Sequence, residues 1–331
     1  MPSSIILGTG HHVPDRVVTN DELSALMDTS DEWIRERTGI QQRHWAREGD
    51  TGVEYARQAA LRALEMAGLA PTDLDAMVYA TLSPDHFVPG NASLLQHALG
   101  APRLAALNVH NGCSGFVYSM SVADAWIRTG LYRRILVVGQ ELVSTRLDVS
   151  TRGRAVSVIF ADGAGAVILG ATEELGRGIM AWDLHSDGAY AKNLWVDGPG
   201  ASMYPPLSVE QLESGRYWPH MDGREVFRHA IVRMPESVEA VLGKAGLTPA
   251  DISLLIPHQA NLRISEAVQK RLGLRDDQVY NNIQRFGNTT AATIPIALDE
   301  CVRAGRLKAG DVFVMTAFGA GFQWGSAAMR W

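Results

Sequence analysis

Apolar residues recur with helical spacing in two long stretches of the chain, and a short apolar run follows each stretch. The first stretch covers residues 56–67 and precedes the run at residues 77–80. The second covers residues 232–245 and precedes the run at residues 254–256. A period near 3.6 predicts amphipathic helices, and the short apolar runs predict buried strands. Helices that alternate with strands are typical of an α/β fold.

The two stretches belong to an internal repeat. Residues 65–76 read EMAGLAPTDLDA and residues 243–254 read GKAGLTPADISL, at an offset of 178 positions. A second pair, residues 128–139 and 303–316, has an offset of about 175 to 177. This period is too long for a solenoid unit and suits two duplicated α/β domains. We therefore expect two halves, residues 1–172 and 173–331.

Cys113 is the first candidate for chemistry. It stands in the turn NGCSGF, between an apolar run typical of a strand and a helical pattern. A position at a helix N-terminus favours thiolate over thiol, which makes a cysteine reactive at neutral pH. The alternative is a small buried cysteine without chemistry, because most free thiols are buried.

His258 and Asn288 are the other two candidates. His258 follows the strand predicted at residues 254–256, and Asn288 stands in the turn FGNTT. The repeat relates the Cys113 turn to the segment at Asn288, and equivalent turns face each other in a duplicated α/β pair. Because ligands bind at the carboxyl ends of strands in such sheets, we expect all three side chains in one cleft.

A cysteine, a histidine and an asparagine point first to covalent acyl transfer. In a papain-like hydrolase the asparagine would orient the imidazole. Here both side chains stand on separate turns and could donate hydrogen bonds to one thioester oxygen, which would stabilise an enolate and favour decarboxylation of a malonyl group. The run FGAGF at residues 318–322 could supply backbone N–H groups to a second oxyanion hole, or could be a tight turn between strands.

Composition narrows the possibilities. The chain has 331 residues, 46% of them hydrophobic, and a net charge of -6, which disfavours a general nucleic-acid-binding surface. Its two cysteines, Cys113 and Cys301, cannot build a disulfide framework or a cysteine-rich metal site, and a free catalytic thiol suits the cytoplasm. Cys301 lies in an apolar-periodic run and is expected in the core. Neither a signal peptide nor a membrane span is predicted.

The chain resembles the type III beta-ketoacyl-acyl-carrier-protein synthases, which are thiolase-like condensing enzymes. The resemblance rests on motifs in a fixed order: DTSDEWIRERTGI from Asp28, the Cys113 turn, FADGAGAVILG from Phe160, GREVF from Gly223, HQANLRI from His258, FGNTTAATIP from Phe286 and FGAGFQWGSA from Phe318. It covers nearly the whole chain. It implies a thiolase-like fold, in which two pseudo-duplicated α/β halves pack as a layered αβαβα sandwich.

The resemblance also implies roles for single residues. Cys113 would accept the acyl group, and His258 with Asn288 would carry out decarboxylation and condensation. The backbone N–H groups of Cys113 and Ala320 would form the oxyanion hole for acylation. The family usually has glycine at the position of Ala320, but alanine keeps the amide.

Two sets of surface residues match substrate-binding positions of the family. The coenzyme A set is Trp33, Arg37, Arg154 and Arg263, in which aromatic and guanidinium planes would stack on the adenine. The set for docking an acidic acyl carrier protein is Arg228, Arg263, Lys270 and Arg271. Without the resemblance, Trp33 would be helix packing and the cations ordinary solvated residues. The implied partners are acyl-CoA, malonyl-acyl carrier protein and a second copy of the chain in a homodimer, with no metal and no other cofactor.

The sequence departs from the family pattern at two places. The nucleophile follows His110-Asn111-Gly112, where small residues are usual. His110 could be a second base, although packing within the loop is the preferred interpretation. Residues 196–218 are longer and richer in proline than the usual connection, and they are predicted to cover the mouth of the pocket.

The expected reaction condenses an acyl-CoA primer with malonyl-acyl carrier protein to a β-ketoacyl product, for fatty-acid or polyketide initiation. The alternative is an acyltransferase of the same fold that moves the acyl group from Cys113 to a hydroxyl or amine, and a binding-only module is the third hypothesis. A nicotinamide site is disfavoured because the glycine pattern at residues 8–13 is incomplete. A serine hydrolase is disfavoured because the residues around Cys113 do not have the spacing of a nucleophile elbow. A biosynthetic thiolase is disfavoured because it would need a second cysteine in residues 318–322.

Overall fold

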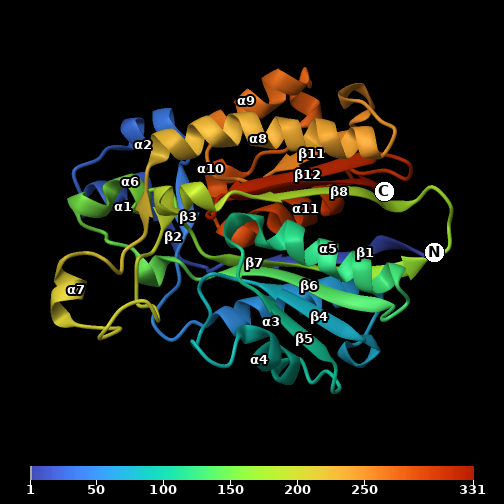
Figure 1. The fold of residues 1–331 in the computed structure, drawn as a ribbon, viewed down its shortest axis with the longest axis horizontal. Coiled ribbons are helices and arrows are strands. Elements are labelled where there is room, and N and C mark those ends of the chain that lie inside the picture. The colour runs from blue at the N-terminus through green and yellow to red at the C-terminus, as the bar shows by residue number, and fades with distance from the viewer. Residues whose placement is uncertain (1) are drawn as a thin grey trace.

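The first half of the chain builds a five-stranded sheet. The computed structural model describes residues 2–331, and its first sheet has the strand order β1-β7-β6-β4-β5 (Figure 1). The strands are β1 (Ser3–His12), β4 (Ala76–Ala80), β5 (Ala105–Val109), β6 (Arg134–Glu141) and β7 (Gly163–Thr172). β4 is parallel to β5 and β6, whereas β7 is antiparallel to β6 and β1. Every residue of β4 is buried, as its continuous apolar run predicts.

The second half builds a sheet of the same design. Its order is β11-β12-β13-β8, formed by β11 (Leu254–Pro257), β12 (Val312–Gly319), β13 (Gln323–Arg330) and β8 (Gly178–Ser186). β11 and β12 are parallel, and β13 is antiparallel to β12 and β8. A single parallel bridge between Leu255 and Val279 lies where the first sheet has β5. The two sheets therefore repeat one topology, as the internal repeat predicts.

Helices complete a layered αβαβα arrangement (Figure 1). α3 (Gly52–Ala67) and α4 (Asn91–Ala98) cover the outside of the first sheet, and α8 (Gly223–Lys244) and α9 (Leu262–Leu272) cover the outside of the second. α5 (Gly115–Arg128) and α11 (Thr293–Arg303) lie between the sheets. One apolar cluster joins Phe116 of α5, Leu298 of α11 and strands of both sheets. Cys301 belongs to this cluster and is fully buried, so its predicted core position is confirmed.

The hydrophobic pattern located these elements but not all of their ends. α8 begins at Gly223 rather than at residue 232, because the side chain of Asp222 caps it by accepting from the backbone N–H of Glu225. β12 ends at Gly319, which pairs with Gln323 of β13. The strands of the two sheets lie in residues 3–172 and 178–330, but α5 and α11 share one core with both sheets. The division into two domains therefore stays a prediction.

A polar cluster joins β1 to α11. Asp299 accepts a hydrogen bond from Thr9 Oγ1 at 2.7 Å, pairs with His11 Nδ1 at 2.6 Å and accepts from Arg303 Nε at 2.9 Å. Burial opposes the ionisation of Asp299, but these hydrogen bonds outweigh burial and hold the pKa of Asp299 below its ordinary value. The cluster connects the first strand to one of the last helices.

Short elements connect these layers. They are β2 (Val17–Thr19), α1 (Asn20–Ser24), α2 (Asp31–Thr38), β3 (Gln42–His44), α6 (Arg154–Ser157), β9 (Leu194–Trp195), α7 (Val209–Glu213), β10 (His220–Met221) and α10 (Ile283–Phe286). α7 lies on a loop that extends from the body of the molecule at the left of Figure 1. Across residues 2–331, none of the helices combines the length and the apolar character that a bilayer crossing needs.

Candidate active site

Cys113 lies at the start of α5, as the sequence predicts. It belongs to the 3-10 turn η2 (Gly112–Ser114), which joins β5 to this helix, and only 7% of the residue is exposed. Gly112 has a φ of 57°, a left-handed conformation that glycine adopts without strain. The turn therefore directs the nucleophile into the space between the two sheets.

The end of β12 is in close contact with the turn that carries Cys113. A Cβ atom added to Gly319 would lie 2.7 Å from Cys113 Cβ and 3.0 Å from Cys113 N, so only glycine fits there. A Cβ atom added to Gly112 would lie 3.6 Å from the backbone N of Ala320. The backbone of residues 319–320 is thus adjacent to the nucleophile, where the predicted oxyanion hole requires it. Residues 320–322 also form the turn between β12 and β13. The run at residues 318–322 is therefore a tight turn between strands, and the same turn could supply the backbone N–H groups of an oxyanion hole.

His258 follows β11 directly and is held by two hydrogen bonds. Its backbone N–H donates to Thr316 O of β12 at 2.8 Å, and its Nδ1 lies 2.7 Å from Thr293 Oγ1. Its Nε2 is buried and has no hydrogen-bond partner among the described residues. Burial lowers the pKa of His258 to about 3, so the imidazole is neutral near pH 7.

Asn288 is fixed through its backbone and its side-chain oxygen. Its N–H donates to Ile159 O at 2.9 Å, and its Oδ1 accepts from the N–H of Thr290 at 2.8 Å. The side chain is therefore oriented, and its Nδ2 is the group left to donate to a ligand.

The three candidates are joined through β12 and the segment from Asn288 to Thr293. His258 contacts both, whereas Cys113 packs against Gly319, and η2 packs against η8 (Thr290–Ala292). The repeat predicted this meeting, because η2 and η8 are the equivalent turns that precede α5 and α11. The chemical roles of the three residues remain predictions.

The protonation state of Cys113 differs from the expectation. Burial, and to a smaller extent the nearby carboxyl of Glu141, raises the pKa of its thiol to about 12. The expected resting thiolate is therefore wrong for the unliganded protein, because loss of hydration outweighs the helix N-terminus. The resting nucleophile is a thiol whose proton must leave when the sulfur is acylated.

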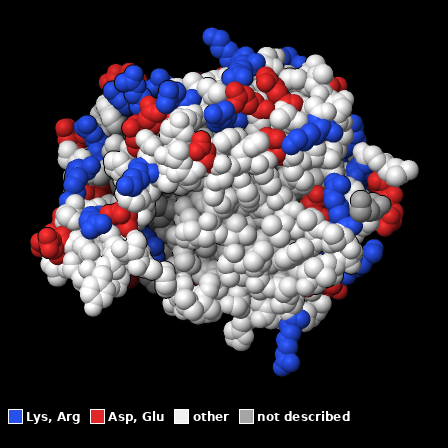
Figure 2. Space-filling view, in the orientation of Figure 1, with Lys and Arg blue, Asp and Glu red and all other residues white. Residues whose placement is uncertain are grey.

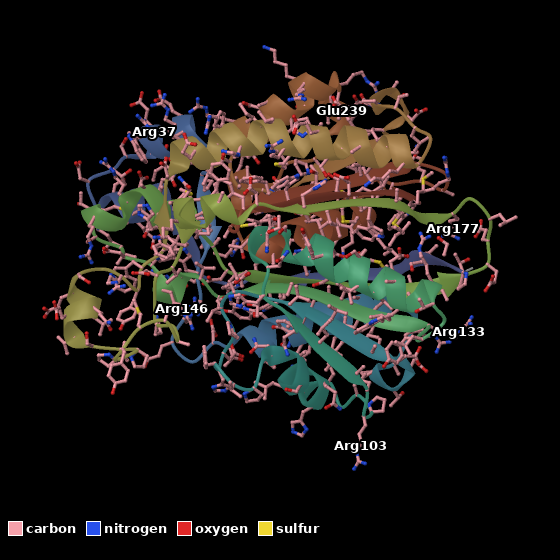
Figure 3. The ribbon with its side chains drawn as sticks, in the orientation of Figure 1. Arg37, Arg103, Arg133, Arg146, Arg177 and Glu239 are labelled. Atoms are coloured by element: carbon pink, nitrogen blue, oxygen red, sulfur yellow. The ribbon has the colours of Figure 1, made fainter. Side chains whose placement is uncertain are left out.

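The predicted coenzyme A residues meet at one surface. Trp33 on α2 lies under two guanidinium groups, with Arg37 Cζ 4.4 Å and Arg154 Cζ 4.9 Å from its ring centre. The side chain of Asn261, which caps α9, donates to Arg37 O at 2.8 Å and so brings Arg263 to the same side of the molecule. Figure 3 labels Arg37 at this corner, and Figure 2 shows a cluster of cations there.

The predicted carrier-protein residues lie on α8 and α9, next to carboxylates. Arg228 is exposed and pairs with Glu225, and Arg271 lies 4.0 Å from Glu236. Arg263 stacks over Phe227 at 5.5 Å. Lys270 occupies the last turn of α9. This surface therefore carries both signs of charge rather than cations alone.

Two expectations about loops have different outcomes. His110 is exposed, so the interpretation that it packs within its loop is wrong: it leaves β5 at the edge of the sheet, where no further strand covers it. Residues 196–218 lie beside η4 (Thr151–Gly153), where Arg152 donates to Glu213 O at 3.3 Å. Their predicted place over the pocket mouth stays a prediction. Within residues 2–331, no group of three or more His, Cys, Asp or Glu side chains could hold a metal ion.

Sequence reasoning missed three residues that support the site. Thr293 contacts His258, Gly319 contacts Cys113, and Glu141 is a buried carboxyl beside the nucleophile. Glu141 carried a signal, since it is an acidic residue at the end of an apolar strand, the position where site residues gather in α/β sheets. Thr293 carried none, because its importance depends on a contact with a distant segment, whereas Gly319 stands in the glycine-rich run 318–322 that was expected to supply backbone N–H groups.

The geometry can now be compared with known proteins. A family model described as 3-oxoacyl-[acyl-carrier-protein] synthase III matches residues 107–188, and the model of its C-terminal region matches residues 242–331. A relative from Cereibacter sphaeroides, a beta-ketoacyl-[acyl-carrier-protein] synthase III, is 46% identical over 332 residues and aligns over 99% of each chain. The chain belongs to the 3-oxoacyl-[acyl-carrier-protein] synthase III family.

Solved structures of the synthase III family share the whole fold. The enzyme from Aquifex aeolicus is 39% identical, covers 100% of both chains and has a TM-score of 0.91. The priming beta-ketosynthase of the R1128 polyketide pathway is 33% identical, covers 99% of this chain and 96% of its own, and has a TM-score of 0.92. Both matches confirm the thiolase-like fold. Membership of the synthase III family makes this chain a condensing enzyme of the transferase class.

Proposed function

We propose that this protein condenses an acyl-CoA primer with malonyl-acyl carrier protein and releases coenzyme A and carbon dioxide. The observation that supports the proposal is that the fold brings one buried cysteine into the same region as two uncharged side chains, His258 and Asn288. These two side chains stand on separate turns. The side-chain oxygen of Asn288 accepts from the N–H of Thr290, which leaves Nδ2 as the group that can donate to a ligand. In a papain-like hydrolase the asparagine orients the imidazole, whereas Thr293 and not Asn288 holds Nδ1 of His258 here.

The first step transfers the acyl group to Cys113. The sulfur attacks the thioester carbonyl of acyl-CoA, and the backbone N–H groups of Cys113 and Ala320 stabilise the oxyanion. The thiol proton of Cys113 is released to water, and coenzyme A leaves as a thiolate that takes a proton from water. No metal and no redox cofactor takes part in this scheme.

The second step forms the new carbon–carbon bond. Asn288 Nδ2 and His258 Nε2 donate to the malonyl thioester oxygen, and each such donor is worth about 2.7 to 4 kcal/mol of barrier. Loss of carbon dioxide gives an enolate that attacks the acyl group on Cys113, and the C–S bond to Cys113 breaks to release a thiolate that takes a proton from water. His258 Nε2 carries a proton only when the Thr293 hydroxyl, which donates to Thr290 O at 3.0 Å in this structure, turns its hydrogen to His258 Nδ1 at 2.7 Å. Thr293 thus sets whether His258 donates or accepts in the site.

Charged and aromatic residues at the surface suit the two substrates. The adenine of coenzyme A would insert between Trp33 and a guanidinium group, because Arg37 and Arg154 already stack on this ring. Arg263 is within the same region and would reach a phosphate. Arg228, Lys270 and Arg271 would meet an acidic carrier protein, which would compete with their present carboxylate neighbours.

The edge of the first sheet suits a homodimer. β5 is an edge strand whose middle residues are exposed, and Leu107 is 37% exposed. In the loop between β4 and α4, Phe87 is 94% and Val88 77% exposed. Figure 2 shows a broad face without charged side chains over α5 and β5. Unpaired backbone groups and apolar side chains on one face are stabilised when a second copy continues the sheet.

The deciding experiment supplies acylated enzyme with malonyl-acyl carrier protein labelled at the free carboxyl carbon. We expect labelled carbon dioxide and a product two carbons longer than its primer. An acyl group delivered intact to an alcohol or amine, without carbon dioxide across a broad panel of primers, would contradict the proposal and support the acyltransferase alternative.

A further inference from the structure

Arg43 lies on β3 and has none of its surface exposed, which is rare for an arginine. Its guanidinium donates from Nη1 to Asn20 Oδ1 at 2.7 Å and to Val18 O at 3.3 Å, and from Nη2 to Val158 O at 2.7 Å. Breaking such a bond would leave a buried cation without a partner, which is costly. The backbone at Val158 is therefore fixed to β3.

Val158 begins a short backbone segment, residues 158–161, that holds Asn288. The N–H of Asn288 donates to Ile159 O at 2.9 Å, and the carbonyl oxygen of Asn288 accepts from the N–H of Ala161 at 2.9 Å. These two bonds form an isolated parallel bridge between the segments. The main chain of Asn288 is thus bound to residues 158–161, and its side chain is carried with it.

Two buried side chains hold this segment. Arg43 Nη2 donates to Val158 O, and Trp45 Nε1 donates to Phe160 O at 3.0 Å. The carbonyl between these two is the one that accepts from Asn288. Three successive carbonyl groups are therefore engaged, and a shift of the outer two would displace the one that binds the predicted catalytic residue.

The stem of Arg43 also contacts the residue that precedes Asn288. Gly287 has a φ of 66°, and a Cβ atom added to it would lie 3.1 Å from Arg43 Cβ and 3.2 Å from Ile159 O. Contacts this close leave no room for a side chain at Gly287. Arg43 therefore supports Asn288 in two ways, through the guanidinium and through direct packing of its stem.

Arg43 is itself fixed by Asn20, which is 1% exposed. Asn20 Nδ2 donates to Ile40 O and to Asp31 Oδ1, both at 2.8 Å, and Asp31 begins α2. Burial lowers the pKa of Arg43 to about 10, so the guanidinium stays charged near pH 7. Its hydrogen bonds are therefore charge-assisted and stronger than bonds between neutral groups.

We infer that Arg43 is a positioning residue for Asn288, acting through residues 158–161 during decarboxylation and condensation. This inference rests on the proposed function. Asn288 Oδ1 is engaged by Thr290, so Nδ2 reaches a substrate oxygen only from the place that its backbone gives it. A displacement of about 1 Å at such a donor can cost about 100-fold in rate. Cys113 is held by its contact with β12 instead, so acylation does not need Arg43.

The test measures two rates on each variant. One is the formation of the acyl adduct on Cys113 from acyl-CoA, and the other is carbon dioxide release when acylated enzyme receives carboxyl-labelled malonyl-acyl carrier protein. Arg43→Met removes the donors but keeps an unbranched stem, and should slow carbon dioxide release by about 100-fold and acylation by less than about 3-fold. Arg43→Lys keeps a cationic donor and should recover about 10-fold of the lost rate.

A double variant separates positioning from a general loss of structure. When Asn288→Ala has already removed the donor, adding Arg43→Met should slow carbon dioxide release by less than about 3-fold more, because the two residues act as one unit. Asp183→Asn is the matched control. It weakens a buried carboxylate on β8 that binds Lys244 at 2.7 Å and His185 at 2.8 Å, so it should lower stability without changing the ratio of the two rates.

Hydrogen exchange measures the position of Asn288 without the reaction. In Arg43→Met, peptides that contain the N–H groups of Asn288 and Ala161 should exchange faster, whereas the peptide around Cys113 should not. Equal losses of both rates, a second 100-fold loss in the double variant, or unchanged exchange would overturn the inference. If Arg43→Met does not fold, Arg43→Lys decides by the same measurements. If acylated wild type releases no carbon dioxide, the proposed function fails, and hydrogen exchange still decides on Arg43.

Discussion

The tight contact between β12 and the nucleophile turn gives a sharp prediction for Gly319→Ala. The new methyl carbon would lie 2.7 Å from Cys113 Cβ, 3.0 Å from its backbone N and 3.3 Å from its Cα. Carbon atoms prefer separations of about 3.5 to 4.0 Å, so the two segments must move apart by about 1 Å. Neither can move freely, because Gly319 pairs with Gln323 in the sheet and Cys113 starts a buried helix.

The consequence divides between stability and activity. Overpacking of a close-packed interior costs about 1 to 3 kcal/mol of unfolding free energy. A shift of about 1 Å in a reacting atom can cost about 100-fold in rate, since the oxyanion donors no longer fit the carbonyl. We therefore expect Gly319→Ala to fold, to unfold at lower urea concentration than wild type, and to acylate Cys113 about 100-fold more slowly.

Urea unfolding and the rate of the acyl adduct on Cys113 measure the two effects. Gly243→Ala is the control, because this exposed helix position has no atom within 4 Å of the added methyl group, and alanine should raise stability by about 0.5 to 1 kcal/mol there. Wild-type acylation and stability in Gly319→Ala would refute the packing argument. Equal losses in both variants would show that the effect does not come from the contact with Cys113.

Three further predictions test other parts of the site and fold. Cys113→Ala should abolish the acyl adduct seen by mass spectrometry; labelling that persists, or that maps to the buried Cys301, would disprove the nucleophile. Asn288→Ala should still form the adduct but lose about 100- to 1,000-fold in condensation, measured as carbon dioxide release; equal loss of both steps would contradict the division of roles. Asp299 is stabilised as a carboxylate by neighbours that include His11, so its contribution is present above its ordinary pKa and lost as pH falls through its lower folded value. Asp299→Asn should therefore unfold more easily than wild type at pH 7, by urea titration, and the difference should shrink below about pH 4; a difference that does not depend on pH would show that charge is not the cause.

Much of the fold follows from local patterns in the sequence. Helical periodicity located α3 and α8, and the continuous apolar runs located β4 and β11. The repeat related the turn at Cys113 to the segment at Asn288, and the structure has equivalent turns there. These features are local because a helix or a buried strand repeats its apolar positions at its own period, whatever its partners are.

Side-chain environments depended on partners that the sequence does not identify. The sequence placed Cys113 at a helix N-terminus and so predicted a thiolate, but burial between two sheets raises its pKa. His110 was expected to pack and is exposed, because β5 ends at an open edge. Hydration is lost only when segments far apart in the chain come together, so a pKa cannot be obtained from neighbouring residues alone.

The sequence by itself determined which elements form, that they repeat, and which thiol begins a helix. The tertiary structure alone decided that Gly319 must be glycine, that Thr293 contacts His258, and that the carboxyl of Glu141 is buried against Ser83. Local preferences are encoded within a few residues of each position. Close packing, hydrogen bonding and the loss of water around a charge arise between residues that are distant in the chain, and only the folded arrangement fixes them.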